Sequence, residues 1–276
     1  MGLANSPGFF QHRMENLFEG ILWKFVLVYI DDIIVFSKTL DQHLIDLDTC
    51  LMLLEWSGVT LALRKCHFGY PSIQALGHHV SRLGLSTIKE KTEAIRNLDY
   101  PETLRQLETG LGFFGYYRKF VPHYAAISKP LLDLKTKKFK GRPGKGKARR
   151  SHAEGTRLEL SEACKRAWDE LQNKLCNAPT LAFPDFDRDF ILHCDGSKER
   201  GYGAALHQIA EGVERPVLFL SKSLDEHEKR YWSTELEVGA LIWALDKLKQ
   251  YLDSNKVTIY TDHHAIRGLF HSKSLG

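Results

Sequence analysis

The sequence predicts an α+β fold, in which strands and helices are grouped along the chain instead of alternating regularly. Two apolar runs, at residues 25–30 and 33–36, have the composition of the paired strands of a hairpin. Helical periodicity dominates from residue 86 to residue 187. From residue 188 onward the predicted order is strand, strand, strand, helix, strand, which indicates a mixed sheet whose last strand can run parallel to its first.

Composition excludes several classes of protein. The 276 residues are 43% hydrophobic and 26% charged, an ordinary globular composition that is long enough for two domains. The net charge of +4 is only mildly basic, so the distribution of charge matters more than its sum. No apolar stretch is long enough to cross a bilayer and no signal-peptide pattern opens the chain, which predicts an intracellular protein without membrane contact. The five cysteines form no CxxC pair and no zinc-spaced cluster, which predicts reduced core residues.

The predicted hairpin carries an acidic pair, Asp31 and Asp32, between its two strands. Apolar residues fill both faces of both strands, so we expect the hairpin to lie deep in a sheet. Adjacent carboxylates repel each other unless a cation neutralises them. The pair is either an incidental acidic turn or a divalent-metal platform for nucleotidyl transfer, and we favour the metal platform.

Helices and short strands should surround this hairpin. Residues 10–18 have the amphipathic spacing of a short helix that leads into it. After the hairpin, Thr39 and Gln42 are spaced as a capping box, and a helix should follow as far as Gly58. Its apolar stripe consists of Leu40, Leu44, Leu47, Leu51 and Leu54. Residues 59–63 and 75–80 have the composition of further strands.

The segment from 86 to 187 should be helical, with helices at 88–98, 104–120 and 160–176. The second of these ends in aromatic residues interleaved with cations, including Tyr116, Arg118 and Lys119. Such a helix end could lie along a nucleic-acid duplex, with the cations on phosphates and the rings against sugars. It could equally be an aromatic core seam with two solvated cations, and the pattern alone favours the core seam.

Residues 135–157 are rich in Lys, Arg and Gly, and we expect a flexible basic loop there. Its positive side chains include Lys145, Lys147, Arg149 and Arg150. A solvated linker needs no function, but dense positive charge near a nucleic-acid groove adds affinity that depends on salt and not on sequence. We favour a linker that also contributes to binding.

Three acids follow the predicted strands and helix of the last section. The strands are expected at 190–194, 202–208, 216–221 and 257–261, and the helix at 234–252. Asp195 ends the first strand, Glu237 lies in the helix and Asp262 ends the last strand. Singly, they could be a turn residue, half of a capping box with Thr234, and a helix cap.

The helical period argues against the capping interpretation of Glu237. This residue shares a stripe with Leu241, Ala244 and Leu248, so it should face the sheet. A carboxylate at the edge of a core needs a partner. Three convergent acids can hold two divalent ions about 3.5 to 4 Å apart, for attack of water on a phosphodiester.

Sequence motifs along nearly the whole chain resemble one family. YIDD at residues 29–32 is preceded by GLANSP with Phe10-Gln11, and is followed by FSKTLDQHL, KCHF and LGH. Four more motifs follow later in the chain, in the same order as in that family: YYRKF, HCDGSKERGYGAALHQ, SKSLDEHEKRYWSTELEVGALIWAL and IYTDHHAI. The chain resembles the Pol polyprotein of gypsy-type LTR retrotransposons, in its reverse transcriptase and RNase H segment.

The resemblance implies a division of the chain. Residues 1–85 would be the C-terminal part of a reverse transcriptase palm. Residues 86–187 would be a thumb and connection that contain the basic loop 135–157. Residues 188–276 would be an RNase H-like domain, truncated at its C-terminus. The implied fold is therefore a partial palm and helical thumb followed by an RNase H-like mixed α/β domain.

The resemblance also implies roles for individual residues. The catalytic and metal-binding residues would be Asp31, Asp32, Asp195, Glu237 and Asp262. Gly2 and Asn5 would line the nucleotide and template site, and the match to YYRKF turns the preference at residues 116–120 toward nucleic-acid contact. The implied cofactor is Mg²⁺ or Mn²⁺. The implied partners are an RNA:DNA hybrid, an RNA template, a DNA primer and dNTP, and a homo-oligomer is compatible with the family.

Two departures from the family limit the expected activity. The family's polymerase site uses a further Asp on a strand before the GLxNxP segment, and its RNase H domain adds a fifth strand and a fourth acid after the helix at His263. We therefore expect an incomplete polymerase site and a largely present RNase H site. The leading hypothesis is a fragment of a retrotransposon reverse transcriptase and RNase H. Its rivals are a non-catalytic nucleic-acid-binding remnant, which a hybrid-cleavage assay would distinguish, and a decayed reading frame without a stable product.

Overall fold

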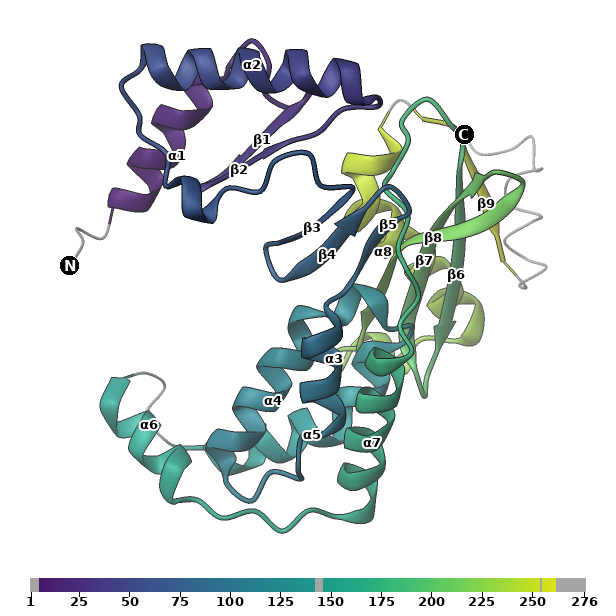
Figure 1. Ribbon diagram of the computed structural model, residues 1–276. Helices are drawn as coiled ribbons and strands as arrows, with labels where there is room; N and C mark the ends of the chain where they lie inside the picture. Colours follow the sequence, from purple (N-terminus) through teal and green to yellow (C-terminus); the bar gives the residue numbers. More distant parts are fainter. Residues whose placement is uncertain (1–4, 142–145, 254, 262–276) are drawn as a thin grey trace, which may run out of the picture. The chain divides into compact units, whose positions relative to one another are not determined.

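The computed structural model describes residues 5–141, 146–253 and 255–261 (Figure 1). The chain forms two compact units, Met1–Ile73 and Gln74–Gly276. This division differs from the boundaries predicted after residues 85 and 187. The reason is visible in the backbone, because Leu85 and Leu181 exchange two hydrogen bonds and Ala182 donates to the carbonyl of Pro216. The predicted palm end, thumb and final sheet are thereby joined into one unit.

The first unit packs two helices against one hairpin. Helix α1 (Ser6–Leu17) precedes strands β1 (Val26–Tyr29) and β2 (Asp32–Val35), and helix α2 (Leu40–Trp56) follows them. A 3₁₀ turn, η1 (Leu63–Lys65), comes after α2. The buried core of this unit consists of Met14, Phe18, Val26, Cys50 and Leu54.

Three expectations for this unit were wrong. The hairpin forms a two-stranded sheet and does not lie deep in a larger one. Residues 59–63 form no strand. In α2, Leu40 and Leu44 are 67% and 59% exposed, whereas Asp46 is buried and accepts hydrogen bonds from Ser37 and Gln42. The predicted leucine stripe is therefore wrong at its first two positions, whereas Leu54 is buried and Leu51 packs against the same core.

A small three-stranded sheet, in the order β3-β4-β5, starts at the boundary between the units and is made of β3 (Ser72–Ala75), β4 (His78–Ser81) and β5 (Gly84–Thr87). A single strand was predicted at 75–80, but Leu76 and Gly77 both have positive φ, of 47° and 72°, and form a turn there. Helix α3 (Lys89–Arg96) follows β5.

Helices make up the middle of the second unit. They are α4 (Leu104–Tyr116), η2 (Arg118–Phe120), α5 (Tyr124–Phe139), α6 (Gly146–Gly155) and α7 (Glu162–Cys176). Leu107, Phe114 and Trp168 are fully or almost fully buried in their common core. The expected flexible loop at 135–157 is wrong for most of its length, since α5 extends to Phe139 and α6 covers ten residues. Ala153 of α6 is buried in the core, which gives this cationic segment an apolar anchor.

The last section forms the predicted mixed sheet, in the order β8-β7-β6-β9. Its strands are β6 (Phe190–Ser197), β7 (Gly201–Ala210), β8 (Val213–Lys222) and β9 (Val257–Tyr260). Strand β9 runs parallel to β6, and helix α8 (Ser233–Leu252) packs mainly on β6 and β7. The predicted order and the parallel return are confirmed. Among the described residues, no helix has the length and apolar character to cross a membrane.

Candidate functional sites

Asp31 and Asp32 lie on an exposed hairpin turn of the first unit. Tyr29 pairs with Asp32, so Ile30 and Asp31 form a two-residue turn, and both carboxylates are exposed. Ile30 has a φ of 52°, in the left-handed region that β-branched residues avoid. A turn of this type would normally use glycine or asparagine. The acidic pair is therefore displayed on a strained turn that needs support from elsewhere.

Gln11 of α1 supplies this support. Its Oε1 accepts a hydrogen bond of 2.6 Å from the backbone N–H of Ile30, and its Nε2 donates to the carbonyl of Val28 over 3.1 Å. A further bond from the same Nε2 to Glu15 fixes the amide on the helix. In the sequence, Gln11 stands out only as part of the Phe10-Gln11 motif. Its partner Ile30 lies 19 residues away, so no local pattern links the two. The face of α1 on which Gln11 lies is the one signal that could have pointed to its role.

The residues expected to line a nucleotide site lie at the start of the chain. Gly2 is outside the described residues. Asn5 precedes α1, where its backbone carbonyl accepts the N–H of Phe9 over 3.1 Å and its side chain makes no capping hydrogen bond. Its side chain is exposed.

In the second unit, a close approach of β6 to α8 brings the backbone that follows Asp195 against Glu237. The backbone N–H of Gly196 donates to Glu237 Oε2 over 3.3 Å. A Cβ on Gly196 would lie 2.3 Å from the carbonyl oxygen of Leu236, so only glycine allows this approach. Glu237 is 8% exposed and lies on the helix face predicted to meet the sheet. That prediction is confirmed.

The rival interpretations of these two acids are wrong. Asp195, Gly196 and Ser197 are not a turn, because all three pair with β7 as part of strand β6. At the start of α8, the carboxylate of Glu235 accepts the backbone N–H of Trp232, so Glu235 serves the helix end. Asp262, the third predicted acid, lies outside the described residues.

Burial shapes the electrostatics next to these acids. Burial raises the pKa of the Cys194 thiol to about 12, and the charge of Glu237 contributes further. A concavity of about 360 Å³ lies beside Asp195, at the ends of β6 and β9. Its lining residues are His193, Cys194, Asp195, Tyr260 and Thr261. The two carboxylates offer oxygen ligands only, the donor set that suits a hard divalent cation such as Mg²⁺ or Mn²⁺.

The aromatic and cationic end of α4 has a structural task. The hydroxyl of Tyr116 bonds to the carbonyl of Leu76, and that of Tyr117 donates to the carbonyl of Gly77 over 2.7 Å. Tyr116 still exposes 51% of its surface, and Arg118 is exposed. Lys119 lies with Nζ 5.5 Å from the ring centre of Phe120, and burial lowers its pKa. The end of α4 therefore combines an aromatic core seam with an exposed ring and an exposed cation.

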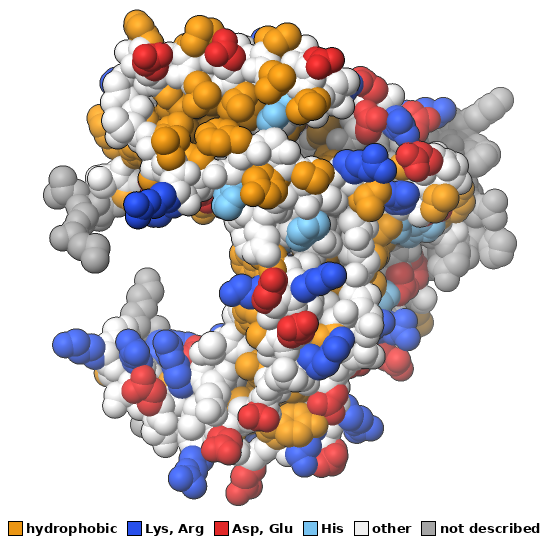
Figure 2. All heavy atoms as spheres, in the orientation of Figure 1, with side chains coloured by type: hydrophobic (Ala, Val, Ile, Leu, Met, Phe, Trp, Pro, Cys, Tyr) orange, Lys and Arg blue, Asp and Glu red, His pale blue; other side chains and the backbone are white. Residues whose placement is uncertain are grey.

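The cations of α6 fall into two groups. Arg149 forms an ion pair with Glu108 and places its guanidinium 3.8 Å from the ring centre of Phe139. Lys147 and Arg150 are exposed, and Arg150 pairs with Glu154 one turn along the helix. Figure 2 shows Lys and Arg side chains gathered where Figure 1 places α6. Lys145 lies outside the described residues.

Two protein families match separate parts of the chain. The family described as "Reverse transcriptase (RNA-dependent DNA polymerase)" matches residues 1–80. The family described as "RNase H-like domain found in reverse transcriptase" matches residues 160–259. These ranges contain the acidic hairpin and the pair Asp195 and Glu237.

Relatives that match nearly all of this chain, and solved structures, agree with the two family matches. The Pol polyproteins of the Drosophila melanogaster transposons opus, 297 and gypsy are 34%, 34% and 32% identical over 96%, 100% and 96% of this chain. The chain spans about a quarter of their length, 26%, 24% and 25%. Foamy viral protease-reverse transcriptase structures, with double-stranded DNA and with an RNA/DNA hybrid, match with TM-scores of 0.79 and 0.76 at 23% identity. The matches extend over 99% and 100% of this chain, and over 45% and 36% of the foamy viral chains. These structures have the same fold as this chain.

Proposed function

Because this chain belongs to the reverse transcriptase and RNase H segment of the Pol polyproteins of gypsy and related LTR retrotransposons, we propose that its second unit hydrolyses the RNA strand of RNA:DNA hybrids. Asp195 and Glu237 are the proposed catalytic residues, together with Asp262 by its place in the family's motif. The contact between Gly196 and Glu237 is the observation that carries this proposal, since it holds the Glu237 carboxylate on the backbone N–H of the residue that follows Asp195.

The chain's own residues would prepare the site before substrate arrives. The N–H of Gly196 orients the Glu237 carboxylate, and burial between α8 and β6 shields that carboxylate from bulk water. Asp195 and Glu237 would hold Mg²⁺ or Mn²⁺ through their oxygens. When bound, such ions supply Lewis-acid charge to the phosphate and lower the pKa of an attacking water. Asp195 borders the concavity at the sheet edge, where a scissile phosphate could approach.

A cleavage assay tests this proposal. Labelled RNA:DNA hybrid is incubated in Mg²⁺ or Mn²⁺ with the wild-type chain and with Asp195→Asn, Glu237→Gln and Asp262→Asn. Asp246→Asn, an exposed acid on the same helix, is the matched control. We expect cleavage by the wild type and the control and loss in the three site variants. Equal cleavage by all five proteins would trace the activity to a contaminant and refute the assignment.

A second proposed function belongs to the first unit. Asp31 and Asp32 would supply two of the acids of a site for templated DNA synthesis, which the family completes with a further Asp, and the partners would be an RNA template, a DNA primer, dNTP and the same class of metal ion. The exposed turn clamped by Gln11 supports this role, because it presents two carboxylates on a held backbone. Primer extension that is lost in Asp31→Asn but kept in Asp41→Asn, an exposed acid at the start of α2, would support it. Equal extension by both variants would contradict it.

A non-catalytic nucleic-acid-binding role is the rival proposal. Arg118, Lys147 and Arg150 are exposed cations that could contact phosphates, and Tyr116 adds an exposed ring. This rival gains support if the chain binds hybrid but cleaves it in neither Mg²⁺ nor Mn²⁺. The cleavage assay above therefore separates the two functions.

A further inference from the structure

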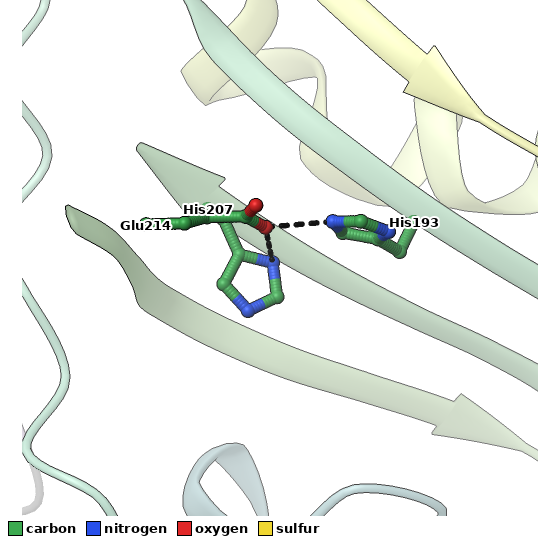
Figure 3. Close-up of side chains that lie close together, drawn as sticks. All are labelled: His193, His207 and Glu214. Carbon is green, nitrogen blue, oxygen red and sulfur yellow. Dashed lines mark hydrogen bonds and ion pairs between the residues drawn. The ribbon is translucent and has the colours of Figure 1, made fainter. Parts of the chain in front are cut away.

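Two histidines and a glutamate converge on the sheet of the second unit, away from the Gly196 contact. His193 lies on β6, His207 on β7 and Glu214 on β8 (Figure 3). One ligand atom from each residue lies within 4.8 Å of the others. Because Ile191 pairs with His207, the two histidines are diagonal neighbours on the same face of the sheet. Sequence spacing gave no sign of this cluster.

The hydrogen bonds within the cluster leave one buried nitrogen unsatisfied. Glu214 Oε1 lies 2.7 Å from His193 Nε2 but 3.6 Å from His207 Nδ1, which is too far for a hydrogen bond. His207 Nδ1 is buried without a hydrogen-bond partner. An imidazole nitrogen without a hydrogen-bond partner is available to a metal ion.

Local structure holds the two rings in place. The ring of His193 stacks on Tyr260 of β9, with centroids 5.1 Å apart and planes 12° apart. A register shift between Leu206 and His207 marks a β-bulge, a feature that redirects side chains from the regular pattern. His207 also meets Phe219 edge-on at 6.1 Å. The two imidazoles are therefore held by packing, and all three ligand residues lie on strands and not on loops.

We propose that His193, His207 and Glu214 form a binding site for a divalent transition-metal ion of the Zn²⁺ class, separate from the carboxylate pair. Two imidazole nitrogens with one carboxylate oxygen are a donor set that binds Zn²⁺ and leaves a fourth position for water. Ligand atoms about 2.0 to 2.1 Å from a tetrahedral ion lie about 3.3 Å apart. The two distances from Glu214 Oε1, 2.7 and 3.6 Å, bracket this spacing, so small side-chain movements would complete the site.

An ion at this site would tie three strands together near Asp195. Strands β6, β7 and β8 each contribute one ligand, and His193 is two residues from Asp195 on β6. A bound ion would therefore stabilise the sheet in the segment that presents this carboxylate. This role goes beyond the proposed nuclease chemistry, which uses oxygen ligands and Mg²⁺ or Mn²⁺.

The site is tested without any assay of activity, by titrating the protein with Co²⁺ or with Zn²⁺ in a buffer that contains excess Mg²⁺. Mg²⁺ occupies the oxygen-ligand sites and competes poorly for imidazole. We expect the full chain to bind one equivalent of Co²⁺ with a ligand-field absorption spectrum that lacks thiolate charge-transfer bands. His193→Ala and Glu214→Gln, both at half-exposed positions, should weaken binding at least about tenfold.

The chain has 13 histidines, so a control is required. His227→Ala changes an exposed histidine outside the cluster and should bind Co²⁺ as the wild type does. Circular dichroism of each variant verifies that the sheet is retained. Failure of the wild type to bind Co²⁺ or Zn²⁺ in excess Mg²⁺ would overturn the proposal. Binding by His193→Ala and Glu214→Gln with wild-type affinity would also overturn it.

Discussion

Gly196 donates its backbone N–H to Glu237 Oε2 over 3.3 Å, across the contact between β6 and α8. The same glycine has no room for a side chain, because the carbonyl oxygen of Leu236 lies 2.3 Å from the position of its missing Cβ. The hydrogen bond and the lack of room for a side chain both result from the close approach of Gly196 to α8. The N–H that follows Asp195 can reach the Glu237 carboxylate only while residue 196 is glycine.

Gly196→Ala should therefore destabilise the second unit and impair the candidate nuclease site together. The added methyl group must push α8 away from β6, at a cost of about 1 to 3 kcal/mol of unfolding free energy. Urea unfolding and hybrid cleavage measure the two effects. Gly112→Ala is the control, since nothing lies within 4 Å of a Cβ there and the helix should tolerate alanine. Wild-type stability of Gly196→Ala would refute the close-approach argument.

The Cys194 thiol should make stability fall in alkaline solution. Its pKa is raised from 9.0 to about 12 in the folded chain, so the native state keeps a proton that the unfolded state loses. Its contribution is fully present below pH 9 and is lost as the pH rises toward 12, by at most about 1.4 kcal/mol per pH unit. The measurement is the unfolding free energy at several pH values from 8 to 10.5.

Cys194→Ala should flatten this alkaline loss, whatever it does to stability at neutral pH. Cys66→Ala, at a half-buried position of the first unit, is the control and should leave the slope unchanged. An identical slope for wild type and Cys194→Ala would show that this thiol does not titrate with folding.

Gln11→Ala should loosen the acidic hairpin. The substitution removes the acceptor for the Ile30 N–H and the donor to Val28, a loss of about 1 kcal/mol in local stability. Amide hydrogen exchange at residues 26–35 should become about fivefold faster. Arg13→Ala, an exposed neighbour on α1, should leave exchange unchanged. Unchanged exchange in Gln11→Ala would mean that the turn is held by other contacts.

The cations of α6 should differ in their effect on nucleic-acid binding. Lys147→Ala and Arg150→Ala remove exposed charges, and each should reduce the slope of log affinity against log salt by about 0.9 if it contacts a duplex phosphate. Arg149→Ala should leave the slope almost unchanged, because this guanidinium is engaged by Glu108 and Phe139. It should instead expose residues 146–155 to trypsin.

Arg166→Ala, an exposed cation on α7, is the reference for this series. Fluorescence anisotropy of a labelled hybrid at several salt concentrations gives the slopes. Slopes equal to that of Arg166→Ala in both the Lys147→Ala and Arg150→Ala variants would show that α6 does not contact nucleic acid.

Local patterns were sufficient to predict the sheet and helix of the last section. The alternation of apolar residues located β6 to β9 within a few residues, and the helical period placed Glu237 on the face of α8 that meets the sheet. Each element carries this information in its own residues, because burial of one face is a property of the element itself. The family motifs added the prediction that Asp195, Glu237 and Asp262 act together.

The same patterns failed where the buried or anchored residues are polar or charged. Asp46 is buried in α2 because Ser37 and Gln42 satisfy it, whereas Leu40 and Leu44 are exposed. The segment at 135–157 has almost no apolar residues, yet α6 is held by Ala153, and Arg149 contacts Glu108 and Phe139. A charge that is neutralised by a distant partner cannot be distinguished from a solvated one in the sequence.

The sequence by itself therefore determined the order of elements in the last section, the inward face of α8 and the family that the chain resembles. Only the tertiary structure decided how side chains from separate elements meet. Gly196 meets Glu237 across 41 residues, Gln11 meets Ile30 across 19, and His193 meets Glu214 across 21. Such contacts depend on strand register, a β-bulge and the approach of a helix to a sheet, which are set by the packing of the whole unit and by no single segment.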